Sequence, residues 1–117
     1  MIKIKRAYEK PSKDDGYRIL VDRVWPRGKT KMQLSLDKWA KELAPSTELR
    51  LYFHHDPGRW APFKARYTKE LRSDTTASET LNRLAKLSRR RVVTLVYGAR
   101  EERYNQAVAL KEMIEQK

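Results

Sequence analysis

The sequence predicts a small α/β protein, a single-domain layered sandwich with a short, mainly parallel sheet and helices on its faces. Three observations favour this class. Two or three strand patterns occupy the first half of the chain, and a helix–helix–strand–helix pattern occupies the second half. The length of 117 residues suffices for one hydrophobic core but not for two, so we expect residues 1–117 to form one domain.

The first half of the chain contains two clear strand patterns. Residues 1–8 alternate apolar and basic side chains, which is typical of a strand with one solvent-exposed face. Residues 10–15 are rich in Pro, Ser and Asp and predict a loop. Residues 17–24 are more continuously apolar and predict a more central strand, which Pro26 and Gly28 end.

The middle of the chain is less regular. Residues 30–44 fit one face of a helix or a short strand equally well. Ser46 is a favourable N-cap for a short helix. The apolar residues of that helix, at helical spacing, are Leu49, Tyr52 and Phe53.

The clearest helical pattern covers residues 60–71. Its apolar members recur at three- and four-residue steps and are Trp60, Phe63, Tyr67 and Leu71. Asp56 and Pro57 fit an N-cap followed by proline at the first helical position. Pro62 would cost about 3 kcal/mol inside a helix begun at residue 57, so we expect the regular helix to start near residue 61.

The last third predicts two helices around one buried strand. Thr76 and Glu79 have the spacing of a capping box for a helix that ends near Arg89. Residues 91–97 predict the buried strand, which Gly98 breaks. The final helix runs toward the C-terminus on Ala107, Leu110 and Ile114.

The chain is strongly basic, with 27 Lys and Arg against 15 Asp and Glu and a formal net charge of +12. This charge favours polyanionic partners, but it equally suits a protein whose excess basic residues face water. No acidic residue occurs between residues 83 and 91, where a basic run offers a nucleic-acid surface or complements a helix dipole. The members of the run are Arg83, Lys86, Arg89, Arg90 and Arg91.

Several function classes are excluded or disfavoured. The absence of cysteine excludes disulfides, thiolate catalysis and cysteine metal sites. No apolar run approaches the roughly 18 residues of a membrane span, and the N-terminus lacks the apolar stretch of a signal peptide. No phosphate-binding glycine loop, nucleophile elbow or zinc-ligand spacing is present. We therefore expect a cytoplasmic protein without membrane contact, metal or cofactor.

The first of three polar clusters follows the second predicted strand and consists of Asp22, Arg23 and Arg27. Ligands of open α/β sheets bind outside the carboxyl ends of the strands. The fork of an arginine matches a carboxylate or a phosphate. Alternatively, Asp22 pairs with an arginine and organises the turn. Trp25 is expected in the core or as a cover over the site.

The second cluster precedes the predicted helix at residues 60–71, and the third precedes the last predicted helix. His54, His55, Asp56 and Arg59 carry acid–base and ligand groups, but adjacent histidines point in different directions and make a poor chelate. Asp56 has a competing role as a helix cap. Residues 97–105 join the last strand to the last helix, where backbone N–H groups, Arg100 and Asn105 suit an anion. Glu101 and Glu102 compete for the same helix dipole.

These motifs together resemble a known family. The runs D-G-Y-R-I-L-V-D-R-V-W-P-R-G (15–28), L-A-P-S-T-E-L-R (43–50), F-H-H-D-P-G-R-W (53–60) and V-T-L-V-Y-G-A-R (93–100) resemble the YeaO-like proteins of domain-of-unknown-function family 488. The resemblance covers essentially the whole chain and implies a compact α/β domain whose motif residues converge. Those residues are Asp22, Arg23, Trp25, Pro26, Arg27, Gly28, Pro45, Ser46, His55, Asp56, Arg59, Trp60, Tyr97, Arg100 and Asn105.

The chain also departs from the family pattern. Some members carry cysteine and histidine in the loop after the last strand, at a position similar to a rhodanese active-site loop. This chain has Tyr, Arg and Asn there, so a thiol reaction is impossible, whereas anion binding is not. Glu101 stands where the family often has Asp, and a histidine frequent near Tyr104 is missing.

The leading hypothesis is a pocket for a small phosphate- or carboxylate-bearing ligand. Its predicted lining is Asp22, Arg23, Trp25, Arg27, His55, Asp56, Arg59, Arg100 and Asn105. The alternatives are a nucleic-acid-binding module that uses the basic surface and a partner-binding domain without chemistry. The sequence leaves open whether any reaction is catalysed.

Overall fold

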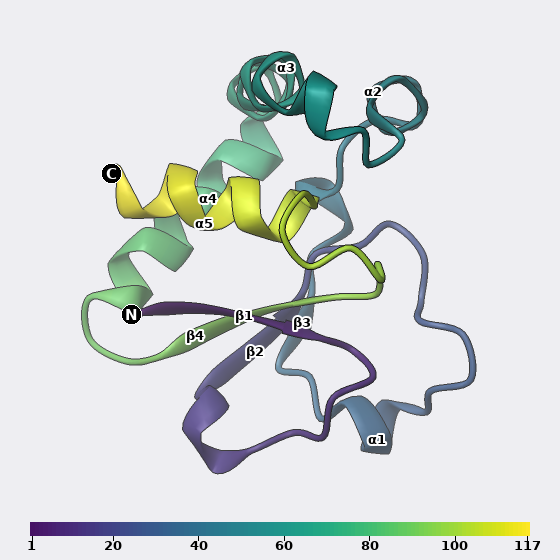
Figure 1. The fold of residues 1–117 in the computed structure, drawn as a ribbon. Helices are drawn as coiled ribbons and strands as arrows, with labels where there is room; N and C mark the ends of the chain where they lie inside the picture. The colour runs from purple at the N-terminus through teal and green to yellow at the C-terminus, as the bar shows by residue number, and fades with distance from the viewer.

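A computed structural model describes residues 1–117 as a four-stranded sheet covered mainly on one face by helices (Figure 1). The strands are β1 (Ile2–Arg6), β2 (Tyr17–Leu20), β3 (Lys38–Trp39) and β4 (Val93–Tyr97). Their order in the sheet is β1-β4-β2-β3, and every pairing is parallel. The α/β class and the parallel sheet predicted from the sequence are confirmed.

More helices cover one face of the sheet than the other. Figure 1 shows α2 to α5 on one side and the single turn of α1 on the other. The helices are α1 (Lys31–Leu34), α2 (Thr47–Phe53), α3 (Trp60–Ser73), α4 (Thr75–Ser88) and α5 (Gln106–Glu115). Short 3₁₀ turns occupy Lys13–Asp15, Lys41–Leu43 and Pro57–Arg59. No helix has the length and apolar character that crossing a membrane requires.

The main core lies between the sheet and α2 to α5. Alternate strand residues such as Ile19, Val93 and Leu95 point toward these helices and are buried there with Phe63 and Leu110. The opposite face holds a smaller apolar cluster of Ala7, Leu20, Leu34 and Val96. Full burial of such side chains stabilises the fold by roughly 1.5–3 kcal/mol each.

A buried ionic network ties the loop after β1 to the second face of the sheet. The Asp15 carboxylate lies 2.6 Å from Nη1 of Arg18 and 3.1 Å from Nζ of Lys5. Thr94 on the central strand donates to the Asp15 carbonyl at 2.7 Å. Burial opposes ionisation of Asp15, but hydrogen bonds from the Ser12 N–H, Lys5 and Arg18 outweigh it and hold the pKa of Asp15 below its ordinary 3.8.

Two predicted helix starts are confirmed, with one refinement. The Ser46 hydroxyl accepts from Leu49 N at 3.1 Å and caps α2. α3 begins at Trp60, which places Pro62 in the first turn, where a backbone N–H needs no partner. Asp56 caps the 3₁₀ turn that precedes α3, accepting from Gly58 N at 2.9 Å.

Other predicted boundaries are wrong. The second strand ends at Leu20 and not at Val24, because the chain turns out of the sheet and Val24 is 70% exposed. Residues 30–44 form both proposed elements in turn, since α1 and β3 are each very short. The predicted capping box at Thr76 does not form, because Asp74 caps α4 by accepting from Ala77 N at 3.2 Å.

Candidate functional site

The carboxyl ends of β2 and β4 define the candidate site. The chain leaves β2 toward β3, whereas it leaves β4 toward α5, which packs against β1. The two connections therefore diverge from adjacent strands, which is where open α/β sheets form a ligand crevice. A pocket of about 510 Å³ opens there, within the size range of small-molecule sites.

The pocket has an apolar wall and a polar set of side chains. Phe53 and Phe63 stack in the wall with ring centroids 4.2 Å apart. The other apolar lining residues are Val24, Ala44, Pro45, Leu51 and Ala99. The polar lining residues are Asp22, Arg23, Arg50, His54, His55 and Gln106. Two of these six side chains are arginines, two are histidines and one, Asp22, is a carboxylate.

Asp22 is the most constrained of the polar lining residues. Its Oδ2 accepts from Gly98 N at 2.8 Å, and its Oδ1 accepts from the Gln106 side-chain amide. Trp39 donates to the Asp22 carbonyl at 2.7 Å. Burial raises the pKa of Asp22 to about 6. The hydrogen bonds from Gly98 N and Gln106 to the carboxylate lower the pKa but do not cancel the effect of burial.

No cation balances the charge of Asp22. The ion pairs of the protein involve other carboxylates, so the predicted alternative of an Asp22–arginine pair is wrong. Arg23 instead donates from Nη2 to the Pro45 carbonyl at 3.0 Å, which links the segment after β2 to the start of α2. A guanidinium has five N–H donors, so Arg23 keeps donors for a ligand.

The turn after α2 places two histidines at the pocket in an unfavourable backbone conformation. His54 and His55 have φ values of 44° and 53°. This left-handed region costs a residue with a side chain roughly 1–2 kcal/mol. Nδ1 of His55 lies 2.9 Å from the Tyr104 carbonyl, which fixes its ring. His54 is the C-cap of α2, and Ser35, the C-cap of α1, has the same left-handed conformation.

The pocket brings together Asp22, Arg23 and His55 from the predicted set. Arg27, Arg59 and Arg100 are exposed and lie outside its lining, so only one of the four predicted arginines reaches it. Arg50, on the last turn of α2, contributes the second guanidinium.

The remaining predicted residues have structural contacts elsewhere. Trp25 packs edge-on against Trp39 at 5.2 Å beside the smaller apolar cluster. Asn105 is fully buried and caps α5 by accepting from Val108 N at 3.1 Å. Asp56, the cap of the 3₁₀ turn, lies 3.8 Å from Arg59, whose guanidinium covers the Tyr52 ring.

Sequence reasoning missed Arg50 and Gln106 as lining residues. Arg50 lies on the polar side of a predicted amphipathic helix, where a basic residue ordinarily faces water. Gln106 follows the cap residue Asn105, so only its proximity to a predicted site residue could have indicated it. No group of His, Asp and Glu side chains is arranged to hold a metal ion.

Comparison with known proteins extends these observations. A family model described as "Inactive DUF488-N3 subclade" matches residues 1–117. The chain is 42% identical over 113 residues to "Uncharacterized protein YeaO" of Escherichia coli strain K12, covering 97% of this chain and 96% of that protein. It is 39% identical to "Uncharacterized protein Rv3073c" of Mycobacterium tuberculosis strain H37Rv, covering 97% and 92%. No solved structure gives a significant match.

Proposed function

The chain belongs to the DUF488 family, in the DUF488-N3 subclade described as inactive, and on this premise we propose that it binds a small anion with an apolar body. The observation that carries the proposal is the pocket, in which Arg23 and Arg50 lie at the rim of an apolar wall. Arginine forks bind carboxylates and phosphates through charge-assisted hydrogen bonds. The net charge of +12 attracts anions to the whole molecule.

A binding role without covalent chemistry agrees with the groups that line the pocket. The protein has no cysteine, so it has no thiolate to attack a ligand. The Asp22 carboxylate is held by Gly98 N and Gln106. The basic side chains at the rim suit recognition of an anion, and the apolar wall gains free energy from covering the rest of the ligand.

Titration with phenyl phosphate and inorganic phosphate, followed by two-dimensional amide NMR, tests this proposal. Phenyl phosphate should shift the amide signals of residues 22–24, 53–55 and 98–99 and bind more tightly than phosphate, because its ring covers the apolar wall. Arg50→Met should weaken binding about tenfold, since a hydrogen bond to a charged group contributes about 1.5–3 kcal/mol.

The matched control is Arg83→Met, which removes a likewise exposed arginine from α4, outside the pocket lining. This variant should bind phenyl phosphate like the unchanged protein. Equal affinity for Arg50→Met and the unchanged protein, or shifts confined to other surfaces, would contradict the proposal.

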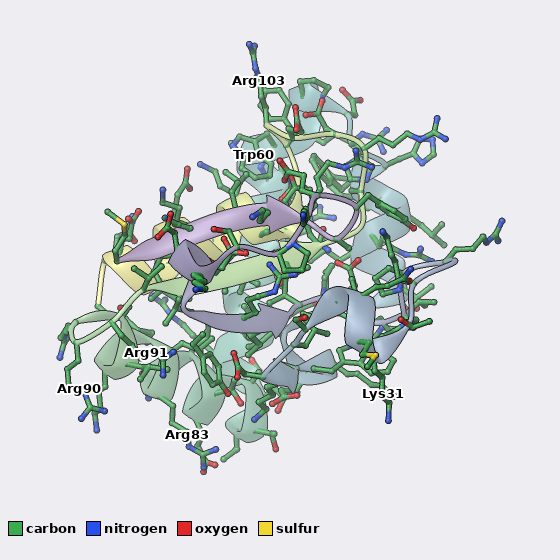
Figure 2. The ribbon with its side chains drawn as sticks, turned by 90° about the horizontal axis from the view of Figure 1, so that it is seen from below. Lys31, Trp60, Arg83, Arg90, Arg91 and Arg103 are labelled. Carbon is green, nitrogen blue, oxygen red and sulfur yellow. The ribbon has the colours of Figure 1, made fainter.

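A second candidate function, nucleic-acid binding, is favoured by one surface. Figure 2 shows Arg83, Arg90 and Arg91 on the same side of the molecule, with Arg83 on α4 and the other two in the turn between α4 and β4. The N-terminal ammonium of Met1 adds charge there, since it donates to the carbonyl groups of Ser88 and Arg91. Arginine and lysine clusters of this kind bind phosphate backbones.

Fluorescence anisotropy with labelled mixed-sequence RNA and duplex DNA tests the second candidate. Affinity should fall steeply with salt. Replacing Arg89, Arg90 and Arg91 by Ser should lower the slope of log affinity against log salt by about one for each phosphate group that the variant no longer neutralises. Arg50→Met is the control and should leave the slope unchanged. Absence of binding at low salt would remove this candidate.

A cytoplasmic location is part of the proposal, because phosphorylated small molecules and nucleic acids are both available there. The location itself stays a prediction. Fractionation of cells that produce the protein at its natural level, followed by immunodetection, tests it.

A further inference from the structure

The polar groups of the pocket are arranged by depth. Asp22 is largely buried at the ends of β2 and β4, whereas Arg23, Arg50, His54 and His55 are exposed at the rim. The apolar wall around Phe53 and Phe63 lies in the same pocket. An acceptor therefore lies at the inner end, and donors lie at the outer end.

The inner end repels an anion. Like charges repel more strongly in a partly buried pocket than in water, because the effective dielectric constant is lower there. Asp22 has no cationic partner in the protein that would cancel this repulsion. A phosphate or carboxylate bound in the pocket must therefore sit at the rim, away from Asp22.

The same carboxylate has unused capacity to accept hydrogen bonds. A carboxylate offers about four lone-pair directions. Gly98 N and the Gln106 amide take one on each oxygen. The Gln106 amide group donates here, which leaves its carbonyl oxygen as a further acceptor at the same end of the pocket.

Gly98 allows the backbone after β4 to approach the Asp22 carboxylate closely. A Cβ at this position would lie 2.9 Å from Oδ2 of Asp22, too close for the carboxylate to keep its place. The backbone of the loop after β4 thus approaches Asp22 directly and holds its carboxylate in one orientation.

We infer that the ligand carries an amine or another cationic N–H donor at the end that reaches Asp22 and an anionic group at the end that meets Arg23 and Arg50. This inference rests on the proposed anion site and narrows its ligand to zwitterionic small molecules with an apolar spacer. Asp22 is then the residue that selects such ligands over simple anions.

The test compares para-(aminomethyl)benzoate with para-methylbenzoate by calorimetry and amide NMR. The two probes share the carboxylate and the ring and differ in the ammonium group. The amine-bearing probe should bind at least about tenfold more tightly, a ratio equal to about 1.4 kcal/mol. Asp22→Asn should remove this preference while para-methylbenzoate still binds, because the asparagine oxygen can accept from Gly98 N and its amide can donate to a rotated Gln106.

Each outcome separates the inference from the proposed anion site. Equal or tighter binding of para-methylbenzoate to the unchanged protein overturns the inference and leaves the anion site intact. Binding of neither probe contradicts both. A preference for the amine-bearing probe that survives in a folded Asp22→Asn variant also overturns the inference. If that variant does not fold, the comparison of the two probes on the unchanged protein remains decisive.

Discussion

Asp22 carries a negative charge that the folded protein tolerates at a cost. Its pKa rises from 3.8 to about 6 because burial removes water from the carboxylate. The folded state therefore holds a proton that the unfolded state has already released between these two values. The contribution of Asp22 to the free energy of unfolding is fully present below about pH 4 and is lost as the pH rises through about 6.

Asp22→Asn should consequently be more stable than the unchanged protein at neutral pH. Each pKa unit corresponds to about 1.4 kcal/mol, so the gain in the free energy of unfolding reaches at most about 3 kcal/mol near pH 8. The gain should shrink toward zero near pH 4. Urea denaturation of both proteins across this pH range measures it, and a gain independent of pH would contradict the assignment.

The pKa of Asp15 is shifted in the opposite direction from that of Asp22, because the ionised form of Asp15 is the one that the fold stabilises. Its side chain and that of Arg18 are about 5% and 4% exposed, and they form an ion pair. Asp15→Asn should lower the free energy of unfolding by about 3 kcal/mol at neutral pH, because Arg18 keeps a buried charge without its partner. Since the pKa of Asp15 is lowered, its contribution persists above pH 4 and is lost as the pH falls through that lowered value.

Asp14→Asn is the matched control for Asp15→Asn. Asp14 is the neighbouring residue in the same 3₁₀ turn, but its side chain is exposed. The substitution should change stability by less than about 0.5 kcal/mol. Equal effects of the two substitutions in thermal or urea unfolding would show that the buried network contributes nothing.

Single residues were predictable where charge interrupts an apolar run. Asp22 and Arg23 follow a strand pattern directly, and both line the pocket. Trp25 and Arg27 belong to the same motif but point elsewhere, since the chain leaves the sheet after Leu20. A motif places residues close in the chain, whereas the direction of each side chain depends on turn geometry that periodicity does not contain.

At the scale of elements, the end of α2 stores backbone strain. His54→Gly should raise the free energy of unfolding by about 0.5 kcal/mol, because glycine removes the left-handed penalty of roughly 1–2 kcal/mol but loses more entropy on folding. Glu48→Gly, in the first turn of the same helix, should instead lower it by about 1 kcal/mol. Thermal unfolding of both variants tests this, and a loss in both would refute strain at His54.

Most helices and strands were predictable from local sequence patterns. Apolar periodicity located α3, α4 and β4, and Ser46 identified the start of α2. The predicted ends of helices were wrong where two nearby residues both suit the same cap position. Asp74 ends α3 and starts α4 in one extended residue, so it took the role expected of Thr76 two positions later. N-cap preferences identify suitable residue types, but they do not show which of two nearby candidates caps the helix.

At the scale of the whole molecule, the parallel sheet was predictable and its strand order was not. The last predicted strand is separated from the first two by helices, so a crossover connection favours parallel pairing with them. The insertion of β4 between β1 and β2 depends on pairing between residues about 90 positions apart, such as Ile2 with Val93. No local pattern encodes such pairing.

This strand order predicts that the N-terminal three-quarters of the chain cannot fold alone. A chain of residues 1–90 should show no cooperative unfolding transition by circular dichroism, because β1 and β2 pair only through β4. A chain of residues 1–115 is the control and should melt cooperatively, since it keeps every strand and helix. A cooperative transition in the shorter chain would contradict the prediction.

The late position of β4 also has a consequence for biosynthesis. While the ribosome is still adding residues 91–97, the apolar strands around Ile2 and Ile19 have no shared neighbour and stay open to other nascent chains. Gly98, which immobilises Asp22, follows the last strand residue. The sheet can therefore be completed only late in synthesis, and the pocket beside Asp22 is completed in that same step.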